Sequence, residues 1–341
     1  MPFQRIGAIT LNTGENNIVS ALIDTANGFA YFGTYTVPGI VVKIRLSDFT
    51  RVGAITLNTE ENILASAVID TTNGFAYFGT QTLGPSDYII KVNLSTFSRV
   101  GAVLVAGADD FVSAIIDITN GFAYFGNNRT SSSGGIVRLR LSDFTITGNI
   151  ILGALELYPY AAVIDTTNGY AYFGTATIPG IVIKVDLSTF TRVGVITLNP
   201  GENSLYSGVI DTTNGYAYFG TYTVPGIVVK IRLSDFTRVG AITLSSEENG
   251  LRSAVINTTN GYAYFGTYTN PGIVIKIRLS DFTRVGAITL SSGENILYSG
   301  VIDTTNGYAY FGTATVPGIV VKVGVQAVPS APLNLILQCG V

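Results

Sequence analysis

Two pairs of adjacent carboxylates are the residues whose type and spacing best suit chemistry: Glu60-Glu61 and Asp109-Asp110. Two carboxyl groups with unlike pKa values can serve as general acid and general base. Adjacent residues of a strand point to opposite faces, however, and we expect glutamates at loop tips to be solvated. A carboxylate-based hydrolase or lyase is therefore an alternative, and our main expectation is a protein that is not an enzyme.

The amino acids that the chain lacks exclude other chemistry. Among 341 residues there is no His and one Cys, Cys339. Hydrolases that need a histidine base, and zinc sites built from His or several Cys, are therefore excluded. We expect no metal site and no cofactor. Calcium is the one ion that loop carboxylates and carbonyl oxygens could bind, although no DxDxDG spacing is present.

Two further series of polar residues recur at regular intervals. One series ends a short apolar segment: Asp24, Asp70, Asp117, Asp165, Asp211, Asn257 and Asp303. The other is cationic: Lys43, Lys91, Arg138, Lys184, Lys230, Lys276 and Lys322. Such rings could bind a cation and an anion. We favour structural roles, in which the first series caps turns and the cationic stems cover aromatic rings.

Both series belong to an internal repeat, which indicates the architecture. The dipeptide Asn-Gly recurs at spacings of 46 to 48 residues: Asn27, Asn73, Asn120, Asn168, Asn214, Asn260 and Asn306. A unit contains four strand-like segments, SGVID, GYAYFGTYT, IVVKIRLS and RVGAITL, separated by turn residues. Four short strands in about 45 residues predict one blade of a β-propeller.

The two ends of the repeat favour a closed ring over an open solenoid. Residues 5–11 match the fourth strand of the unit, whereas the seventh unit stops after its third strand at residues 319–323. Pairing of these segments would leave no exposed edge. We therefore predict an all-β fold over residues 1–323: a seven-bladed β-propeller with four antiparallel strands per blade, closed by the N-terminal strand.

The repeat unit resembles a known group. The segments Val-Ile-Asp, Asn-Gly-Tyr-Ala-Tyr-Phe-Gly-Thr and Gly-Ile-Val-Val-Lys-Ile are similar to YVTN-type β-propeller repeats of bacterial and archaeal surface proteins. The resemblance covers residues 5–323 and implies a binding or surface-layer module that is extracellular or at the cell surface. Residues 324–341 leave the repeat, and we expect a linker toward a following domain there.

Composition narrows the range of partners. The net charge is −3 and only 12% of the residues are charged, so the chain has no general attraction to nucleic acid. No apolar run approaches the roughly 20 residues that a membrane helix needs, and we expect no membrane insertion. We expect a monomeric ring whose ligand is a protein or a glycan.

The residues best suited to ligand binding lie in loops on one face. In a propeller, the loops between blades share that face with the loops between the second and third strands. Departures from the repeat gather there in blades three and four. The candidate binding residues are Tyr35, Asp109, Asp110, Asn127, Asn128, Arg129, Glu156, Tyr158, Tyr160, Tyr222 and Tyr268.

Several functions fit these patterns. The main expectation is a non-enzymatic binding or scaffold module of a larger surface protein, which presents its loop face to a protein or glycan. The alternatives are a carbohydrate-binding lectin, the carboxylate-based enzyme, and a spacer without a ligand. The chain has no Trp, so a lectin would have to stack sugars on tyrosine. A concave, tyrosine-lined depression on the loop face would favour a binding module over a spacer.

Overall fold

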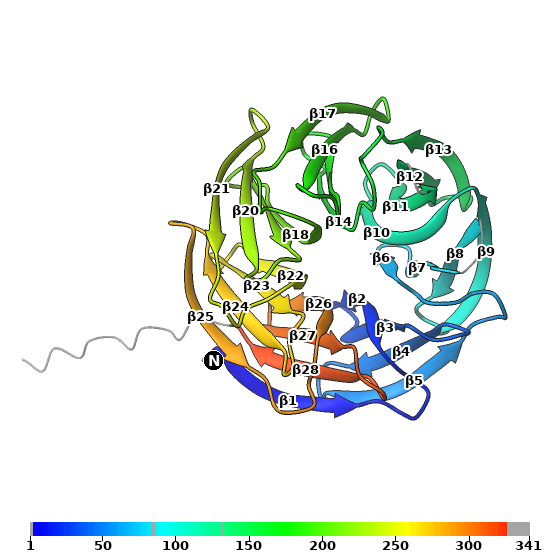
Figure 1. The fold of residues 1–341 in the computed structure, drawn as a ribbon. Coiled ribbons are helices and arrows are strands. Elements are labelled where there is room, and N and C mark those ends of the chain that lie inside the picture. Colours follow the sequence, from blue (N-terminus) through cyan, green and yellow to red (C-terminus); the bar gives the residue numbers. More distant parts are fainter. Residues whose placement is uncertain (1–2, 83–85, 131–132, 326–341) are drawn as a thin grey trace, which may run out of the picture.

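Seven antiparallel sheets of four strands each stand around a central axis (Figure 1). The computed structural model describes residues 3–82, 86–130 and 133–325. These described residues form strands and turns and no helix, so they contain no apolar helix that could cross a bilayer. The predicted seven-bladed propeller is confirmed. The expected linker at residues 324–341 lies almost wholly outside the described residues.

The first four blades follow one another along the chain. Blade one contains β2 (Ile18–Asp24), β3 (Phe29–Thr34), β4 (Ile40–Arg45) and β5 (Thr50–Thr56). Blade two contains β6 (Ser66–Asp70), β7 (Phe75–Gly79), β8 (Ser86–Asn93) and β9 (Ser98–Ala106). Blade three contains β10 (Asp109–Asp117), β11 (Phe122–Thr130), β12 (Ser133–Arg140) and β13 (Thr145–Ile151). Blade four contains β14 (Ala161–Asp165), β15 (Tyr170–Gly174), β16 (Ile181–Asp186) and β17 (Thr191–Thr197).

The remaining blades end with the one that joins the two ends of the repeat. Blade five contains β18 (Leu205–Asp211), β19 (Tyr216–Thr221), β20 (Ile227–Arg232) and β21 (Thr237–Thr243). Blade six contains β22 (Leu251–Asn257), β23 (Tyr262–Thr267), β24 (Ile273–Arg278) and β25 (Thr283–Thr289). Blade seven contains β26 (Leu297–Asp303), β27 (Tyr308–Thr313), β28 (Ile319–Gly324) and, from the start of the chain, β1 (Gln4–Thr10).

The ring closes through the pairing of β1 with β28, as the sequence predicts. The two strands are antiparallel, with Gly7 opposite Lys322 and Thr10 opposite Ile319. Beyond the strand, the Phe3 ring packs against Tyr264 of blade six, 5.6 Å between ring centroids. The N-terminal segment therefore completes blade seven and also contacts its neighbour.

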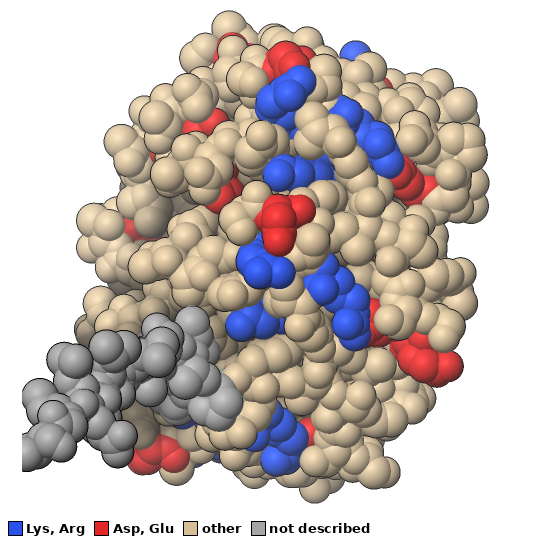
Figure 2. Space-filling view, turned by 90° about the vertical axis from the view of Figure 1, so that its left-hand side faces the viewer, with Lys and Arg blue, Asp and Glu red and all other residues tan. Residues whose placement is uncertain are grey.

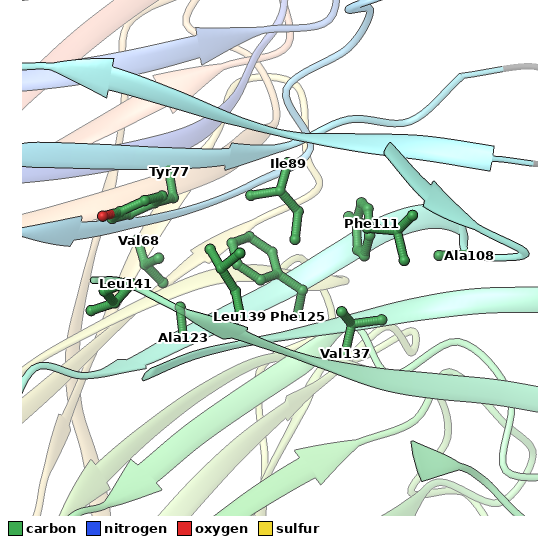
Figure 3. Close-up of a cluster of buried hydrophobic side chains, with 11 residues drawn as sticks. Val68, Tyr77, Ile89, Ala108, Phe111, Ala123, Phe125, Val137, Leu139 and Leu141 are labelled. Atoms are coloured by element: carbon green, nitrogen blue, oxygen red, sulfur yellow. The ribbon is translucent and has the colours of Figure 1, made fainter. Parts of the chain in front are cut away.

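The core lies between blades rather than inside one layer. The second strand of each blade buries a tyrosine and the phenylalanine that follows it, which point to opposite faces, as Tyr77 and Phe78 do in blade two. In Figure 3, Tyr77 and Ile89 of blade two lie opposite Phe125 of blade three. Because both faces of a blade are apolar, each blade needs a neighbour on both sides.

The repeated cations also join neighbouring blades. The Nζ atom of Lys43 lies 3.9 Å from the ring centroid of Phe29 in its own blade and 5.2 Å from that of Phe97 in blade two. The other six cations lie over two such rings in the same way. Burial lowers the pKa of Lys43. The structural interpretation of this series is confirmed, with each cation held against aromatic rings.

The repeated aspartates cap turns, as favoured from the sequence. Asp24 accepts hydrogen bonds from the backbone N of Asn27 (3.0 Å) and from its Nδ2 (2.8 Å). Five further aspartates make the same two bonds. Asn257 has one acceptor oxygen and takes only the backbone bond, so the Asn260 amide turns to the carbonyl of Val325 (2.8 Å).

Six interblade loops each bury one glutamate, and for these the expectation of solvation is wrong, whereas Glu60 and Glu247 are exposed, as expected. Glu202 is 5% exposed, and its Oε2 accepts a hydrogen bond from Arg238 Nε at 2.8 Å. Its backbone carbonyl accepts from the N of Gly180 in blade four at 2.8 Å. Six blades contain this arrangement, with the pairs Glu15–Arg51, Glu61–Arg99, Glu156–Arg192, Glu202–Arg238, Glu248–Arg284 and Glu294–Arg5. Each glutamate thus fastens the loop between two blades to both of them, because its desolvated charge requires a fixed partner.

Blade three lacks both members of the pair. Ala108 occupies the glutamate position, since its N donates to Val105 O as Glu61 N does to Asn58 O. Ile146 occupies the arginine position opposite Leu139 and packs against the same apolar cluster as Ala108. An apolar pair therefore replaces the ion pair as a unit.

We predict strong energetic coupling between Glu202 and Arg238. Glu202→Ala should cost roughly 2 kcal/mol in urea unfolding, because it leaves the Arg238 guanidinium without its acceptor. The double variant Glu202→Ala/Arg238→Ile copies blade three and should recover about 1 kcal/mol of the summed single losses. The exposed pair Arg232–Asp235 is the control and should show no measurable coupling. Strict additivity at Glu202 and Arg238 would contradict the role assigned to the pair.

Candidate functional site

A cavity of about 500 Å³ opens where the seven inner strands surround the axis. It lies on the loop face, where interblade loops contact the loops between second and third strands, as Gly39 N does with Glu61 O. One residue of each inner strand, or just before it, lines the cavity: Val19, Ala65, Val112, Tyr160, Tyr206, Arg252 and Tyr298. We call these seven the mouth ring. The volume falls in the range of roughly 300–1,000 Å³ typical of small-molecule sites.

The floor below the mouth ring is built rigidly. Next along each inner strand comes a buried serine in six blades, and five of these serines bond to a carbonyl of the following blade, for example Ser20 Oγ to Leu64 O (2.6 Å). The others are Ser113, Ser207, Ser253 and Ser299. Hydrogen bonds that cross from blade to blade fix the positions of the side chains above them.

The mouth ring breaks the seven-fold symmetry. Blades one to three contribute the small residues Val19, Ala65 and Val112, whereas blades four to seven contribute three tyrosines and an arginine. The cavity is therefore open over one side of the ring and walled by aromatic side chains on the other. A repeat that is nearly uniform in its core thus differs in chemistry at the mouth.

Six tyrosines form a continuous series of ring contacts, which we call the tyrosine arc: Tyr158, Tyr160, Tyr206, Tyr222, Tyr268 and Tyr298. Tyr160 and Tyr206 stack with centroids 4.5 Å apart, and Tyr222 meets Tyr268 edge-on at 5.2 Å. Gly250 leaves room for this packing, because a Cβ there would lie 2.9 Å from Tyr268 Cβ. Such mutual packing holds the rings in place and leaves part of their surface toward the cavity.

Arg252 is the cation of the cavity. Its guanidinium carbon lies 4.3 Å from the ring centroids of both Tyr206 and Tyr298. Nη2 donates to the Tyr298 hydroxyl at 2.8 Å, whereas the buried Nε has no acceptor. Of the arginines whose side chains are described, only Arg138 and Arg252 lack a carboxylate partner, and Arg138 donates instead to Thr147. Arg252 therefore presents unneutralised charge in an aromatic setting.

A second cluster, of carboxylates, lies between blades two and three. Oxygen atoms of Asp87, Asp109 and Asp110 lie within 4.8 Å of one another. Asp110 has a positive φ of 50° at an irregularity in β10, which is why two adjacent carboxylates turn toward one site. The expectation that they point apart is therefore wrong. Gln81 lines the cavity and hydrogen-bonds to Asp110, so it connects the cavity with this acidic cluster.

Asp87 is the buried member of this acidic cluster. It accepts hydrogen bonds from Thr80 Oγ1 (2.6 Å), Thr82 N (2.8 Å) and Asp110 N (2.7 Å). Desolvation nevertheless raises the pKa of Asp87 to about 6, and it also raises the pKa of Asp109 and Asp110. Carboxylate oxygens are the ligands that calcium prefers, so the expectation that calcium could bind stays a prediction for this cluster.

The candidate residues from the sequence divide into separate groups. Tyr35, Tyr160 and Tyr268 line the cavity, and Tyr158 and Tyr222 belong to the tyrosine arc. Asp109, Asp110 and Asn128 meet in the acidic cluster, where Asn128 Nδ2 lies 3.4 Å from Asp110 Oδ2. Asn127 is buried beside it on β11, with both amide atoms unpartnered. The Arg129 side chain lies outside the described residues.

Glu156 is the candidate whose assignment changes. It is one of the buried glutamates, 5% exposed, and its Oε1 pairs with Arg192 of blade four. Its Oε2 accepts from Gly153 N at 2.8 Å, so both oxygens serve the loop. Glu156 therefore holds the connection between blades three and four and does not line the cavity.

Sequence reasoning missed the site residues Asn17, Gln81, Asp87, Tyr206, Arg252 and Tyr298. The last three occupy the same position of the repeat, in LYSG, LRSA and LYSG, where the local pattern indicates an ordinary strand. The residue at this position differs between blades that are otherwise closely alike, and this difference is the sequence feature that could have indicated the site. Asp87 lies in the insertion QTLGPSDY, whose local sequence gives no indication of a buried carboxylate.

Charge on the outer surface is mixed in sign. On the side shown in Figure 2, cationic and acidic atoms lie next to one another and most of the surface is uncharged. Exposed pairs such as Arg232–Asp235 and Arg278–Asp281 contribute to this pattern. In its distribution of charge, the cavity is thus more distinctive than this outer side of the ring.

Comparison of the chain with protein-family models and with curated proteins found no match. The site is therefore interpreted from its own geometry. It combines flat aromatic surfaces, one unpaired guanidinium and the amides of Asn17 and Gln81 in a concave space. Such a lining can stack against a ligand, donate hydrogen bonds and attract negative charge.

We predict that Asp87 makes stability depend on pH between 7 and 5. In the folded protein its pKa is about 6, whereas an unfolded Asp titrates near 4, so the folded state binds more protons in this window. Stability from this group should therefore rise by roughly 1 kcal/mol as the pH falls from 7 to 5.

The measurement is urea unfolding in EDTA at both pH values, for the protein and for Asp87→Asn. The variant cannot titrate at this position and should lack the gain, whatever the other carboxylates contribute to both proteins. Equal pH dependence of the two proteins would show that Asp87 is ionised throughout this range.

Proposed function

We propose that the chain is a non-enzymatic binding module whose ligand enters the cavity at the mouth ring. The observation that supports this most directly is the tyrosine-lined depression of about 500 Å³ on the loop face. A spacer would have no need for an asymmetric mouth ring, with small side chains in three blades and tyrosine or arginine in the other four. The rigid ring would act by display, since its loops hold the site without rearrangement.

A glycan suits this cavity better than a flat protein epitope. Tyr160, Tyr206 and Tyr298 line the cavity, and the parts of their rings that Arg252 and the mutual stacking leave uncovered offer aromatic surface to the C–H groups of a sugar. Asn17 and Gln81 add amides that can bond to hydroxyls. The lectin alternative thereby becomes the preferred form of the proposal, and a protein ligand would have to insert a single protruding side chain.

A catalytic role is not part of the proposal. Two carboxylates of the acidic cluster are held by hydrogen bonds: the buried Asp87 bonds to Thr80, and Asp110 bonds to Gln81 and Asn128. Acid–base catalysis would need a carboxyl group free to reach the substrate proton. The resemblance to YVTN-type repeats supports the further proposal of a module of a larger protein at the cell surface.

The test is a glycan array probed with the chain, in calcium and in EDTA, followed by titration of the best ligand. Tyr206→Ala and Tyr298→Ala should each weaken binding about fivefold to tenfold, because each removes one aromatic surface worth about 1 kcal/mol. Val316→Ala, at an exposed turn outside the cavity, is the control and should bind normally.

Two results would count against the proposal. If the chain binds no glycan on the array, a protein ligand or a spacer role would be favoured. Unchanged affinity of both tyrosine variants, with folding confirmed by circular dichroism, would place the ligand elsewhere on the ring.

A further inference from the structure

The unpaired state of Arg252 needs an explanation. Ten arginines pair with carboxylates within 3.2 Å, including every arginine on a fourth strand that faces a loop glutamate. Arg252 faces the cavity instead, and its buried Nε–H has no acceptor. A buried donor without an acceptor is destabilising, so the placement of Arg252 at the cavity points to a role beyond packing.

The aromatic rings around Arg252 hold its guanidinium in one position at the cavity. Tyr206 and Tyr298 lie at equal distances from it, 4.3 Å each, and Tyr222 and Tyr268 lie at 5.1 and 5.5 Å. The bond to the Tyr298 hydroxyl orients the plane. Stacked aromatic rings do not neutralise a cation, so its charge remains available to an acceptor of the right geometry.

The nearest acidic groups do not supply that acceptor. Asp87, Asp109 and Asp110 lie together on the side of blades two and three, where Asp87 accepts hydrogen bonds from Thr80 and Thr82. Arg252 projects from blade six, and no carboxylate among the described side chains bonds to it. The two charge signs are therefore held apart, which gives the ligand a preferred orientation in the cavity.

We propose that the cavity is selective for a sugar that bears a carboxylate, with Arg252 as the residue that determines this selectivity. The inference rests on the proposed function and names its ligand class. The carboxylate accepts hydrogen bonds from the terminal Nη donors of Arg252 that the bond to Tyr298 leaves free, in a charge-assisted contact, whereas the buried Nε–H keeps its place against the aromatic rings. The pyranose ring lies against the tyrosine arc, and its hydroxyls meet Asn17 and Gln81.

An acidic peptide is the competing ligand, and the lining favours the sugar. Asp or Glu side chains would satisfy Arg252 equally well, but a peptide also has backbone donors and acceptors that need partners. The open inner side of the mouth is formed by Val19, Ala65 and Val112, whose side chains cannot hydrogen-bond. A compact ring with hydroxyls at its edge matches the combination of aromatic faces and two amides more closely.

The experiment compares two ligands of the same skeleton. Calorimetric titration uses trigalacturonate, its fully methyl-esterified form and a hexapeptide rich in glutamate. The chain should bind the acid at least tenfold more tightly than the ester. Arg252→Gln should remove this preference, so that the acid and the ester bind to the variant with affinities within twofold of each other. Arg232→Gln removes the same charge from the exposed rim and should leave the preference intact.

Each other outcome overturns a defined part of the inference. Equal affinity for acid and ester, unaffected by Arg252→Gln, would leave the binding site standing and remove the role of Arg252. Tighter binding of the peptide than of the acid would replace the sugar by an acidic side chain. Lack of binding by all three probes would refute the acidic-sugar inference, and the glycan array would then decide separately on the proposed function.

Discussion

Every blade of this ring is apolar on both faces, and the rest of the structure depends on that constraint. Tyr218 and Phe219 of β19 are both buried, although they point to opposite sides of one sheet. Burying such a ring contributes on the order of 2–3 kcal/mol, but only if a neighbouring blade covers it. A single blade, or an open row of blades, would leave one face in water. Closure through β1 and β28 satisfies the last pair of faces.

The glutamate–arginine ion pairs fix the loops on one face of the closed ring. Besides its buried leucines, a loop between blades contains Glu202 or its equivalent, which holds the loop to both neighbours through a side chain and a carbonyl. Glu294 performs this task with Arg5 of the N-terminal strand, which makes the closing blade equivalent to the others. The loops are consequently positioned well enough to support a mouth of fixed shape. Blade three achieves the same end with Ala108 and Ile146 packed in the core.

The fold could be predicted from the sequence, and the bounds of the closing strands β1 and β28 to within one residue. The reason is that seven copies of the same weak local pattern support one interpretation. Seven copies of Asn-Gly and an offset between the chain ends leave few alternatives to a ring. The site was predictable only in part. Tyr35, Tyr160, Tyr222 and Tyr268 were identified from their place on the loop face, but Tyr206, Arg252 and Tyr298 lie on inner strands that read as core. Burial of the loop glutamates was missed because the arginine partner lies some 36 residues away, on the outermost strand.

Repetition also explains why the mouth ring can vary while the core does not. A core position such as Phe219 touches the next blade, so any change there affects two sheets. A mouth-ring side chain projects toward the axis, where it meets the cavity rather than a neighbouring sheet. Val19, Tyr206 and Arg252 can therefore replace one another in nearly identical blades without disturbing the packing below. A seven-fold scaffold gains an asymmetric site in this way, because its chemistry is confined to one repeat position whose side chains pack on one another beside the cavity and not in the core between blades.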